Sequence, residues 1–143
     1  MAQIRDVMTS DVKTVSPDST AQEAASFMLS ADTGSIPVCQ DDRVIGMITD
    51  RDIAVRGTAQ GKGPDCRVSD LMSDGIVCAR DTDDVLAIAQ RMSDSQVRRL
   101  PVLDAEDRLV GMVSLGDLSR QSQEAAAKTA LDGVSAEAPQ NQP

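Results

Sequence analysis

The chain has 143 residues, 41% of them hydrophobic, and a formal net charge of −9, which favours one globular domain and opposes contact with a nucleic-acid backbone. With one Phe and no Tyr or Trp it has almost no aromatic surface for stacking on bases, so we expect no nucleic-acid partner. It contains no histidine, the commonest general base and a usual ligand of transition metals, so we expect neither an enzyme nor a metal site.

A stretch of about fifty residues occurs twice in the chain. The recurring blocks are Val7-Met8-Thr9 with Leu71-Met72-Ser73, Ile36-Pro37-Val38 with Leu100-Pro101-Val102, and Gly46-Met47-Ile48-Thr49 with Gly111-Met112-Val113-Ser114. The third block returns one position later than the other two, which indicates an insertion in the polar stretch 104–108, where a surface turn tolerates it. Because one copy buries too little surface alone, we expect the two to pack about a pseudo-twofold axis, with related ligand sites near the seam.

Each copy begins with a short segment that ends in Met and continues into a predicted strand. The segments are Ile4 to Met8 and Val68 to Met72, and the strands are Val12 to Val15 and Ile76 to Ala79. A helix follows, for which Thr20 with Glu23 predicts a capping box and Asp84 is the corresponding cap. Apolar residues then recur with the spacing of one buried helical face. They are Ala21, Ala24, Ala25 and Met28, and Val85, Ile88, Ala89 and Met92.

Two short strands after this helix predict a hairpin in each copy. They are Ser35 to Cys39 with Val44 to Thr49, and Leu100 to Leu103 with Leu109 to Ser114. Pro37 and Pro101 cannot donate a ladder hydrogen bond, which places them at a strand start, an edge or a bulge. A second helix begins around Asp50 and Leu115. The predicted fold class is therefore α+β, with two β-α-β-β-α repeats.

The predicted organisation has a first repeat at 1–60, a second at 61–120, and a C-terminal helix with a disordered tail at 121–143. A glycine-rich link, 57–66, joins the repeats. The three cysteines form no CxxC pair and are odd in number, which favours reduced thiols. No apolar run approaches the roughly 20 residues that cross a bilayer, and no basic-then-apolar leader opens the chain. We expect no membrane partner and a cytoplasmic location.

The pattern G-h-h-[ST]-x-x-D-h occurs at both predicted strand-to-helix junctions. Thr49 and Asp52 are its polar members in the first copy, and Ser114 and Asp117 in the second. One interpretation is structural, because a Ser or Thr followed three residues later by a carboxylate is typical of a helix cap. The other is functional, because a carboxylate accepts hydrogen bonds from both hydroxyls of a sugar diol.

The order and spacing of these elements resemble a tandem pair of cystathionine-beta-synthase (CBS) domains, a Bateman module, over residues 3 to 120. The resemblance rests on Asp6-Val7-Met8 and Asp70-Leu71-Met72, the two strands containing Pro-Val, and both junctions. It implies that adenine nucleotides bind, as regulatory ligands and not as cofactors, in clefts between the copies. Asp52 with Thr49 would serve one cleft and Asp117 with Ser114 the other, with aliphatic strand residues against the adenine.

The candidate ligand-binding residues come from the first strands, the hairpin starts, the junctions and neighbouring arginines. They are Val12, Lys13, Thr14, Ser35, Ile36, Pro37, Thr49, Arg51, Asp52, Ile76, Val77, Cys78, Arg98, Arg99, Leu100, Pro101, Ser114 and Asp117. Arg51 lies in the first junction where the second has Gly116, so the two clefts are not equivalent. The arginines suit bidentate phosphate contacts, although pairing with neighbours such as Asp50 or a solvated face explains them equally well.

Two hypotheses of function follow. The first is a stand-alone regulatory module that senses adenosine-containing ligands such as AMP, ADP, ATP or S-adenosylmethionine and acts on an effector protein in trans. The resemblance also implies a homodimer of such modules. The alternative is a ligand-free dimerisation or scaffold protein that acts through protein–protein contacts. Titration with adenosine compounds separates the two, because a scaffold responds to none of them.

Overall fold

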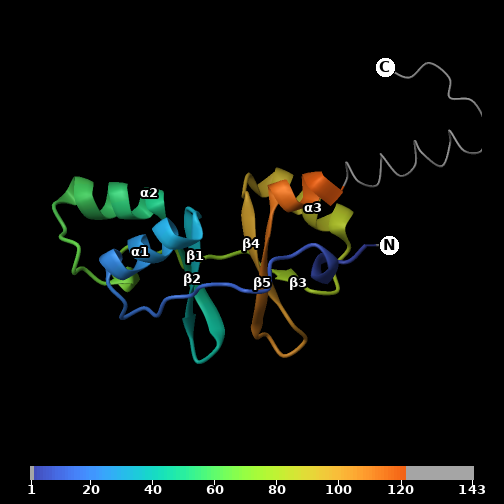
Figure 1. The fold of residues 1–143 in the computed structure, drawn as a ribbon, viewed down its shortest axis with the longest axis horizontal. Coiled ribbons are helices and arrows are strands. Elements are labelled where there is room, and N and C mark those ends of the chain that lie inside the picture. Colours follow the sequence, from blue (N-terminus) through green and yellow to red (C-terminus); the bar gives the residue numbers. More distant parts are fainter. Residues whose placement is uncertain (1, 122–143) are drawn as a thin grey trace, which may run out of the picture.

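A computed structural model describes residues 2–121 of the chain, and Figure 1 shows its fold. The elements are η1 (Ile4–Asp6), α1 (Ala21–Ala31), β1 (Ser35–Gln40), β2 (Arg43–Thr49), α2 (Asp50–Asp52), η2 (Ile53–Gly57), η3 (Thr58–Gln60), η4 (Val68–Asp70), β3 (Ala79–Arg80), α3 (Val85–Ser95), β4 (Arg99–Leu103) and β5 (Leu109–Ser114). Residues 115–121 are helical. The predicted C-terminal helix and tail lie beyond position 121, outside the residues that the structure describes. Within residues 2–121, no helix has the length and apolar character to span a bilayer.

Two antiparallel hairpins form the centre of the fold. β1 pairs with β2, and β4 pairs with β5, while β3 joins the second hairpin as a parallel neighbour of β4. Figure 1 shows the hairpins facing each other, with α1 and α2 outside the first and α3 outside the second. At the hairpin tips, Arg43 Nη1 lies 3.9 Å from Asp107 Oδ2. The predicted α+β class, with two repeats about a pseudo-twofold axis, is confirmed.

The hairpins differ by one residue, as the repeat spacing predicts. Cys39 pairs with Val44 in the first hairpin, whereas Leu103 pairs with Leu109 in the second. The extra residue lies in the turn 104–108. Each first strand carries a register shift one or two positions after its proline, which agrees with the prediction of a bulge or edge at these prolines.

The prediction of a first strand in each repeat is mostly wrong. In the first repeat Val15 alone forms a bridge, parallel to Val38, and in the second repeat the strand is Ala79–Arg80 and not 76–79. The physical reason is that the preceding residues cross between the halves. Thr9 bonds to Met112 in the second half, whereas Val15 bonds to the first hairpin, so the residues between them have no strand beside them.

The helices begin close to their predicted positions. Thr20 Oγ1 accepts a hydrogen bond from Glu23 N (3.1 Å), but the structure gives no return bond from the Glu23 side chain, so half of the predicted capping box forms. Asp84 caps α3 by accepting from Ala87 N, as predicted. Three of the four predicted positions on each apolar face are buried. The prediction was wrong for Ala25, which is exposed, and Ala89 is only half-buried. The second helix of the first repeat continues through η2 and η3 to Gln60, into the stretch predicted as a link.

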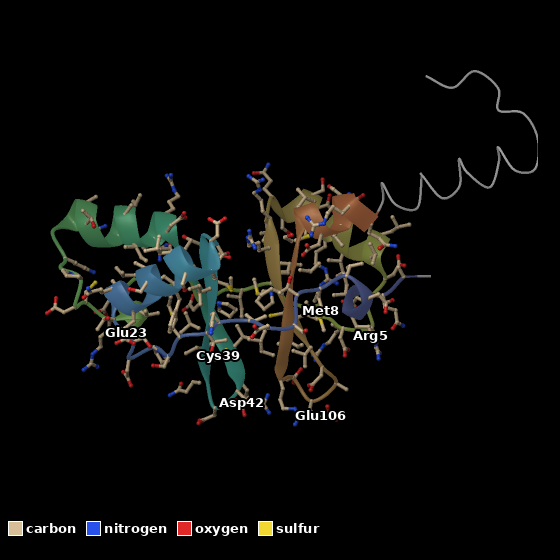
Figure 2. The ribbon with its side chains drawn as sticks, viewed as in Figure 1. Arg5, Met8, Glu23, Cys39, Asp42 and Glu106 are labelled. Atoms are coloured by element: carbon tan, nitrogen blue, oxygen red, sulfur yellow. The ribbon has the colours of Figure 1, made fainter. Side chains whose placement is uncertain are left out.

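The two hydrophobic cores exchange their opening segments. Ile4 is fully buried among the core residues of the second repeat, and Val68 and Leu71 are fully buried in the core of the first. Figure 2 shows Arg5 and Met8 beside the second hairpin, far from Glu23 of the same repeat. Each exchanged segment also forms a two-bond antiparallel bridge, Thr9 with Met112 and Ser73 with Met47, at 2.8–2.9 Å. The core of the second repeat is therefore built from two separate stretches of chain, and the core of the first extends into the opening segment of the second repeat.

Candidate functional site

Both strand-to-helix junctions form complete capping boxes. Thr49 Oγ1 accepts from Asp52 N (3.0 Å), and Asp52 Oδ2 accepts from Thr49 N (3.0 Å). Ser114 and Asp117 repeat this arrangement at 3.0 and 2.9 Å. The structural interpretation of the junction motif is therefore correct, and it occupies one carboxylate oxygen at each junction.

The second carboxylate oxygen of each junction faces an arginine one helical turn later. Asp52 Oδ1 lies 3.9 Å from Arg56 Nε, and Asp117 Oδ1 contacts Arg120 Nη2. Arg56 is anchored further, because its Nη1 donates to the carbonyl oxygens of Leu71 and Met72 at 3.2 Å each. Asp52 thus belongs to a structural chain of contacts that ties the α2 start to the exchanged segment.

A large cleft of about 960 Å³ opens along the seam between the repeats. It is built from the junction of the first repeat, the loop before β3, and the start of β4. Its predicted members are Ser35, Thr49, Arg51, Ile76, Val77, Arg98, Arg99, Pro101 and Ser114. Its volume falls in the range of roughly 300–1,000 Å³ that is usual for small-molecule sites.

A smaller cleft of about 220 Å³ combines the opposite parts of the two repeats. The loop before Val15 and the start of β1 meet the junction of the second repeat. Its predicted members are Val12, Lys13, Ser35, Ile36, Pro37, Arg99, Ser114 and Asp117. Aliphatic side chains therefore lie in the same cleft as a carboxylate and two basic side chains, the combination expected from the sequence.

Ser35 lies between the two clefts and lines both. Its Oγ is buried and has no hydrogen-bond partner within residues 2–121. A buried hydroxyl without a partner costs about 1–3 kcal/mol, so Ser35 is a strained polar position at the wall that the two clefts share.

Four of the predicted residues line neither cleft. Asp52 is held by its cap and by Arg56, and Leu100 is buried in the core at 1% exposure. Cys78 contributes its carbonyl oxygen to Arg91 Nη1 (2.8 Å). Thr14 instead lines a third cavity of about 450 Å³ with Asp42 and Asp104, on the side of the hairpin tips that Asp42 and Glu106 mark in Figure 2. The ligand-binding role of all the candidates stays a prediction.

Several cleft residues were not found from the sequence. In the small cleft they include Asp11, Asp32 and Thr33, and in the large cleft Asp50, Gln96 and Arg120. Asp32 and Gln96 are equivalent positions in the two repeats, and both end a helix in the left-handed conformation (φ 51° and 56°). The repeat could have indicated these two positions, because in both copies the residue that follows the buried helical face caps the helix.

The cysteines are free, as the sequence predicts. Burial raises the pKa of the Cys39 thiol, and the charge of Asp42 raises it further. Burial also raises the pKa of Cys78, although nearby Arg80 opposes this effect. Both thiols are therefore protonated at neutral pH, which is the state of a structural cysteine and not of a nucleophile.

The CBS domain family model matches residues 4–56 and 68–124, and the chain belongs to this family. The CBS domain-containing protein YhcV of Bacillus subtilis (strain 168) is 43% identical over 136 residues, which cover 94% of this chain and 96% of the relative. Hypoxic response protein 1 of Mycobacterium tuberculosis is 38% identical over 128 residues, or 88% of this chain and 89% of that protein.

Solved structures share the fold. The crystal structure of Hypoxic Response Protein I with two coordinated zinc ions matches with a TM-score of 0.76 and 36% identity, covering 83% of this chain and 98% of the other. A crystal structure of the CBS domain pair of protein MJ0100 in complex with 5′-methylthioadenosine and S-adenosyl-L-methionine has a TM-score of 0.75 and 26% identity. It covers 84% of this chain and 98% of the other.

Proposed function

We propose that this chain is a regulatory module, without catalytic activity, that binds adenosine-containing ligands in the clefts between its two CBS domains. The observation that carries the proposal is the small cleft, where the Asp117 carboxylate and Ser114 of one repeat face Val12, Ile36 and Pro37 of the other. The adenosine compounds bound by the CBS domain pair of MJ0100 support the same ligand class.

The chemistry of this cleft suits a nucleoside. A carboxylate has about four acceptor positions, so the cap and Arg120 leave Asp117 capacity for the hydroxyls of a ribose. The aliphatic walls suit the faces of an adenine ring, whose burial is favourable without any aromatic partner.

Regulation follows from the position of the clefts on the seam. A ligand that contacts both repeats shifts the protein between two arrangements if it binds one of them more tightly. The change in arrangement then acts on a separate effector protein in trans. The proposed assembly is a homodimer of modules. The predicted cytoplasmic location stays a prediction.

The proposal does not include zinc ions like those of Hypoxic Response Protein I. The sequence has no histidine, and residues 2–121 contain no group of three Cys, Asp or Glu side chains that could hold a metal ion.

Thermal unfolding with a panel of adenosine, 5′-methylthioadenosine, S-adenosylmethionine, AMP, ADP and ATP tests the proposal. A ligand at 100 times its dissociation constant adds about 2.7 kcal/mol, which raises Tm by roughly 10 °C in a chain of this size. We expect Asp117→Asn to reduce this shift for at least one compound, because asparagine keeps an acceptor for the cap but loses the negative charge.

Asp52→Asn is the matched control, because Asp52 forms the same cap but lines neither cleft. We expect it to leave the ligand response unchanged. Equal responses of both variants would remove Asp117 from the site, and no response of the wild-type protein to any compound would contradict the proposal.

That last outcome would favour the scaffold hypothesis. The outer helices carry two exposed leucines, Leu29 on α1 (86% exposed) and Leu86 on α3 (68% exposed). Single exposed leucines are common on proteins, so the oligomeric state has to be measured directly. Sedimentation of Leu29→Ser and Leu86→Ser variants measures whether they hold an assembly together.

A further inference from the structure

Three arginines that line the large cleft have no ion pair and no side-chain hydrogen bond within residues 2–121. They are Arg51, Arg98 and Arg99. By contrast, Arg120 of the same cleft and five arginines outside it each lie within 4 Å of a carboxylate oxygen. Those five are Arg43, Arg56, Arg67, Arg80 and Arg108. In a chain of net charge −9, acidic partners are plentiful, so three unpaired guanidinium groups at one cleft are a concentration of available positive charge.

The two clefts differ in the balance of charged residues that line them. The large cleft contains four arginines and a single acidic residue, Asp50, whose Oδ1 accepts from the Arg51 amide at 2.8 Å. The small cleft contains three aspartates, Asp11, Asp32 and Asp117, against Lys13 and Arg99. Because Asp117 is paired with Arg120, the other two aspartates of the small cleft balance its two basic residues. Within the described part of the chain, the large cleft keeps three unpaired arginines against one aspartate and is net positive, although the sequence motifs at the two clefts are copies of one another.

We propose that the two clefts divide adenosine ligands by charge: the large cleft binds those that carry phosphate groups, and the small cleft binds those that carry none. This inference rests on the proposed function for the adenosine part of the ligand. Guanidinium groups match phosphate oxygens with two parallel hydrogen bonds, and Arg51 and Arg98 approach the large cleft from different repeats. A phosphate chain between them joins the two halves across the seam. In the small cleft, Asp11 and Asp32 offset the two basic residues, so no surplus of positive charge attracts a phosphate and a ligand without one is favoured.

Calorimetric titration of wild-type protein with ATP, AMP, adenosine and 5′-methylthioadenosine, at low and high salt, measures this division. We expect ATP to bind more tightly than AMP and its affinity to fall with salt, because phosphate contacts are screened. Adenosine and 5′-methylthioadenosine should bind with little salt dependence, and prior saturation with ATP should leave their binding intact.

The double variant Arg51→Gln/Arg98→Gln should weaken ATP binding at least tenfold and leave adenosine binding unchanged. Arg99 is kept because it lines both clefts. The control is Arg43→Gln/Arg67→Gln, which removes the same total charge from paired arginines outside the clefts and should change neither affinity. Asp117→Asn should do the reverse of the double variant, weakening adenosine and sparing ATP.

The outcomes separate this inference from the proposed function. Competition of ATP and adenosine for one site, or an unchanged ATP affinity in Arg51→Gln/Arg98→Gln, overturns the division by charge but leaves an adenosine-binding module. Binding of inorganic triphosphate that the same double variant abolishes, without binding of any adenosine compound, supports the phosphate site and contradicts the proposed function. Absence of all binding overturns both.

Discussion

Gly46 lies against the main chain of Ser73 so closely that a Cβ on Gly46 would stand 2.6 Å from the Ser73 carbonyl oxygen. Gly111 has the same relationship to Thr9, at 2.8 Å. Each glycine opens a junction motif, and each faces the segment that the other repeat contributes. The glycine that begins each copy of the motif is therefore required by the close approach of the exchanged segment, and not by ligand binding.

We expect Gly46→Ala to destabilise the protein by about 1–3 kcal/mol, because the methyl group forces the bridge between Met47 and Ser73 apart. Urea unfolding followed by circular dichroism measures the change. Gly75→Ala is the control, since a Cβ there meets nothing within 4 Å, and its effect should stay within about 1 kcal/mol. Equal effects of the two substitutions would show that the close approach does not constrain position 46.

Because of the exchange, the first residues of the chain contribute to the stability of the second repeat. We expect Ile4→Ala to cost about 2–5 kcal/mol, because Ile4 is fully buried in the core of the second repeat. Leu29→Ala, at a side chain that is 86% exposed, should change stability by less than about 0.5 kcal/mol. Denaturant unfolding of both variants provides the comparison. A small effect at Ile4 would mean that the opening segment detaches without loss of the core.

The elements that depend on local pattern could be predicted from the sequence. The helical faces of α1 and α3, the hairpins and the one-residue difference between their turns follow from periodicity and from the repeat. The first strands could not be predicted, because Val12 and Ile76 have the composition of a strand but lie where the chain crosses between halves. The exchange itself leaves no local signal, since Ile4 and Val68 are apolar in either arrangement.

Most members of the candidate site could be predicted from the sequence, but their distribution between the two clefts could not. The fold brings most of the predicted residues to the clefts at the seam. The sequence pattern, however, gives no reason to distinguish Asp52 from Asp117. The structure separates them: Asp117 lines the small cleft and Asp52 lines neither cleft, although each forms a cap and faces an arginine one helical turn later. Arg56, the partner of Asp52, also donates to the carbonyl oxygens of Leu71 and Met72, a contact that depends on the exchanged segment.

That contact makes Arg56 a structural residue. We expect Arg56→Met to lower the free energy of unfolding by about 1 kcal/mol, since it removes two charge-assisted hydrogen bonds from a half-exposed guanidinium. Arg67→Met, which removes an exposed ion pair with Asp18 at 3.6 Å, should have almost no effect. Thermal unfolding measures both, and a loss at Arg67 as large as that at Arg56 would contradict the role given to the carbonyl contacts.

Asp104 in the turn before β5 links the stability of the second hairpin to pH. Its carboxylate accepts from the backbone amides of Arg108 and Glu106, at 2.9 Å each, and also meets the Arg108 guanidinium at 3.1 Å. The backbone hydrogen bond from Arg108 is the largest cause that lowers the pKa of this carboxyl below its ordinary value of 3.8; the Glu106 amide and the Arg108 charge add to it, and desolvation opposes it. Because the folded state favours the ionised form, the contribution to stability is complete above pH 3.8 and is lost as the pH falls through the lower pKa of the folded protein.

We therefore expect Asp104→Asn to be less stable than wild type at neutral pH, with a difference that shrinks as the pH falls below 3.8. Thermal unfolding as a function of pH measures this convergence. Glu106→Gln is the control from the same turn, since its carboxylate meets Arg108 at 3.5 Å on an exposed surface and should make a small contribution. A constant difference between Asp104→Asn and wild type across the acid range would mean that asparagine disturbs the turn by its shape, and that the charge of Asp104 contributes nothing to folding.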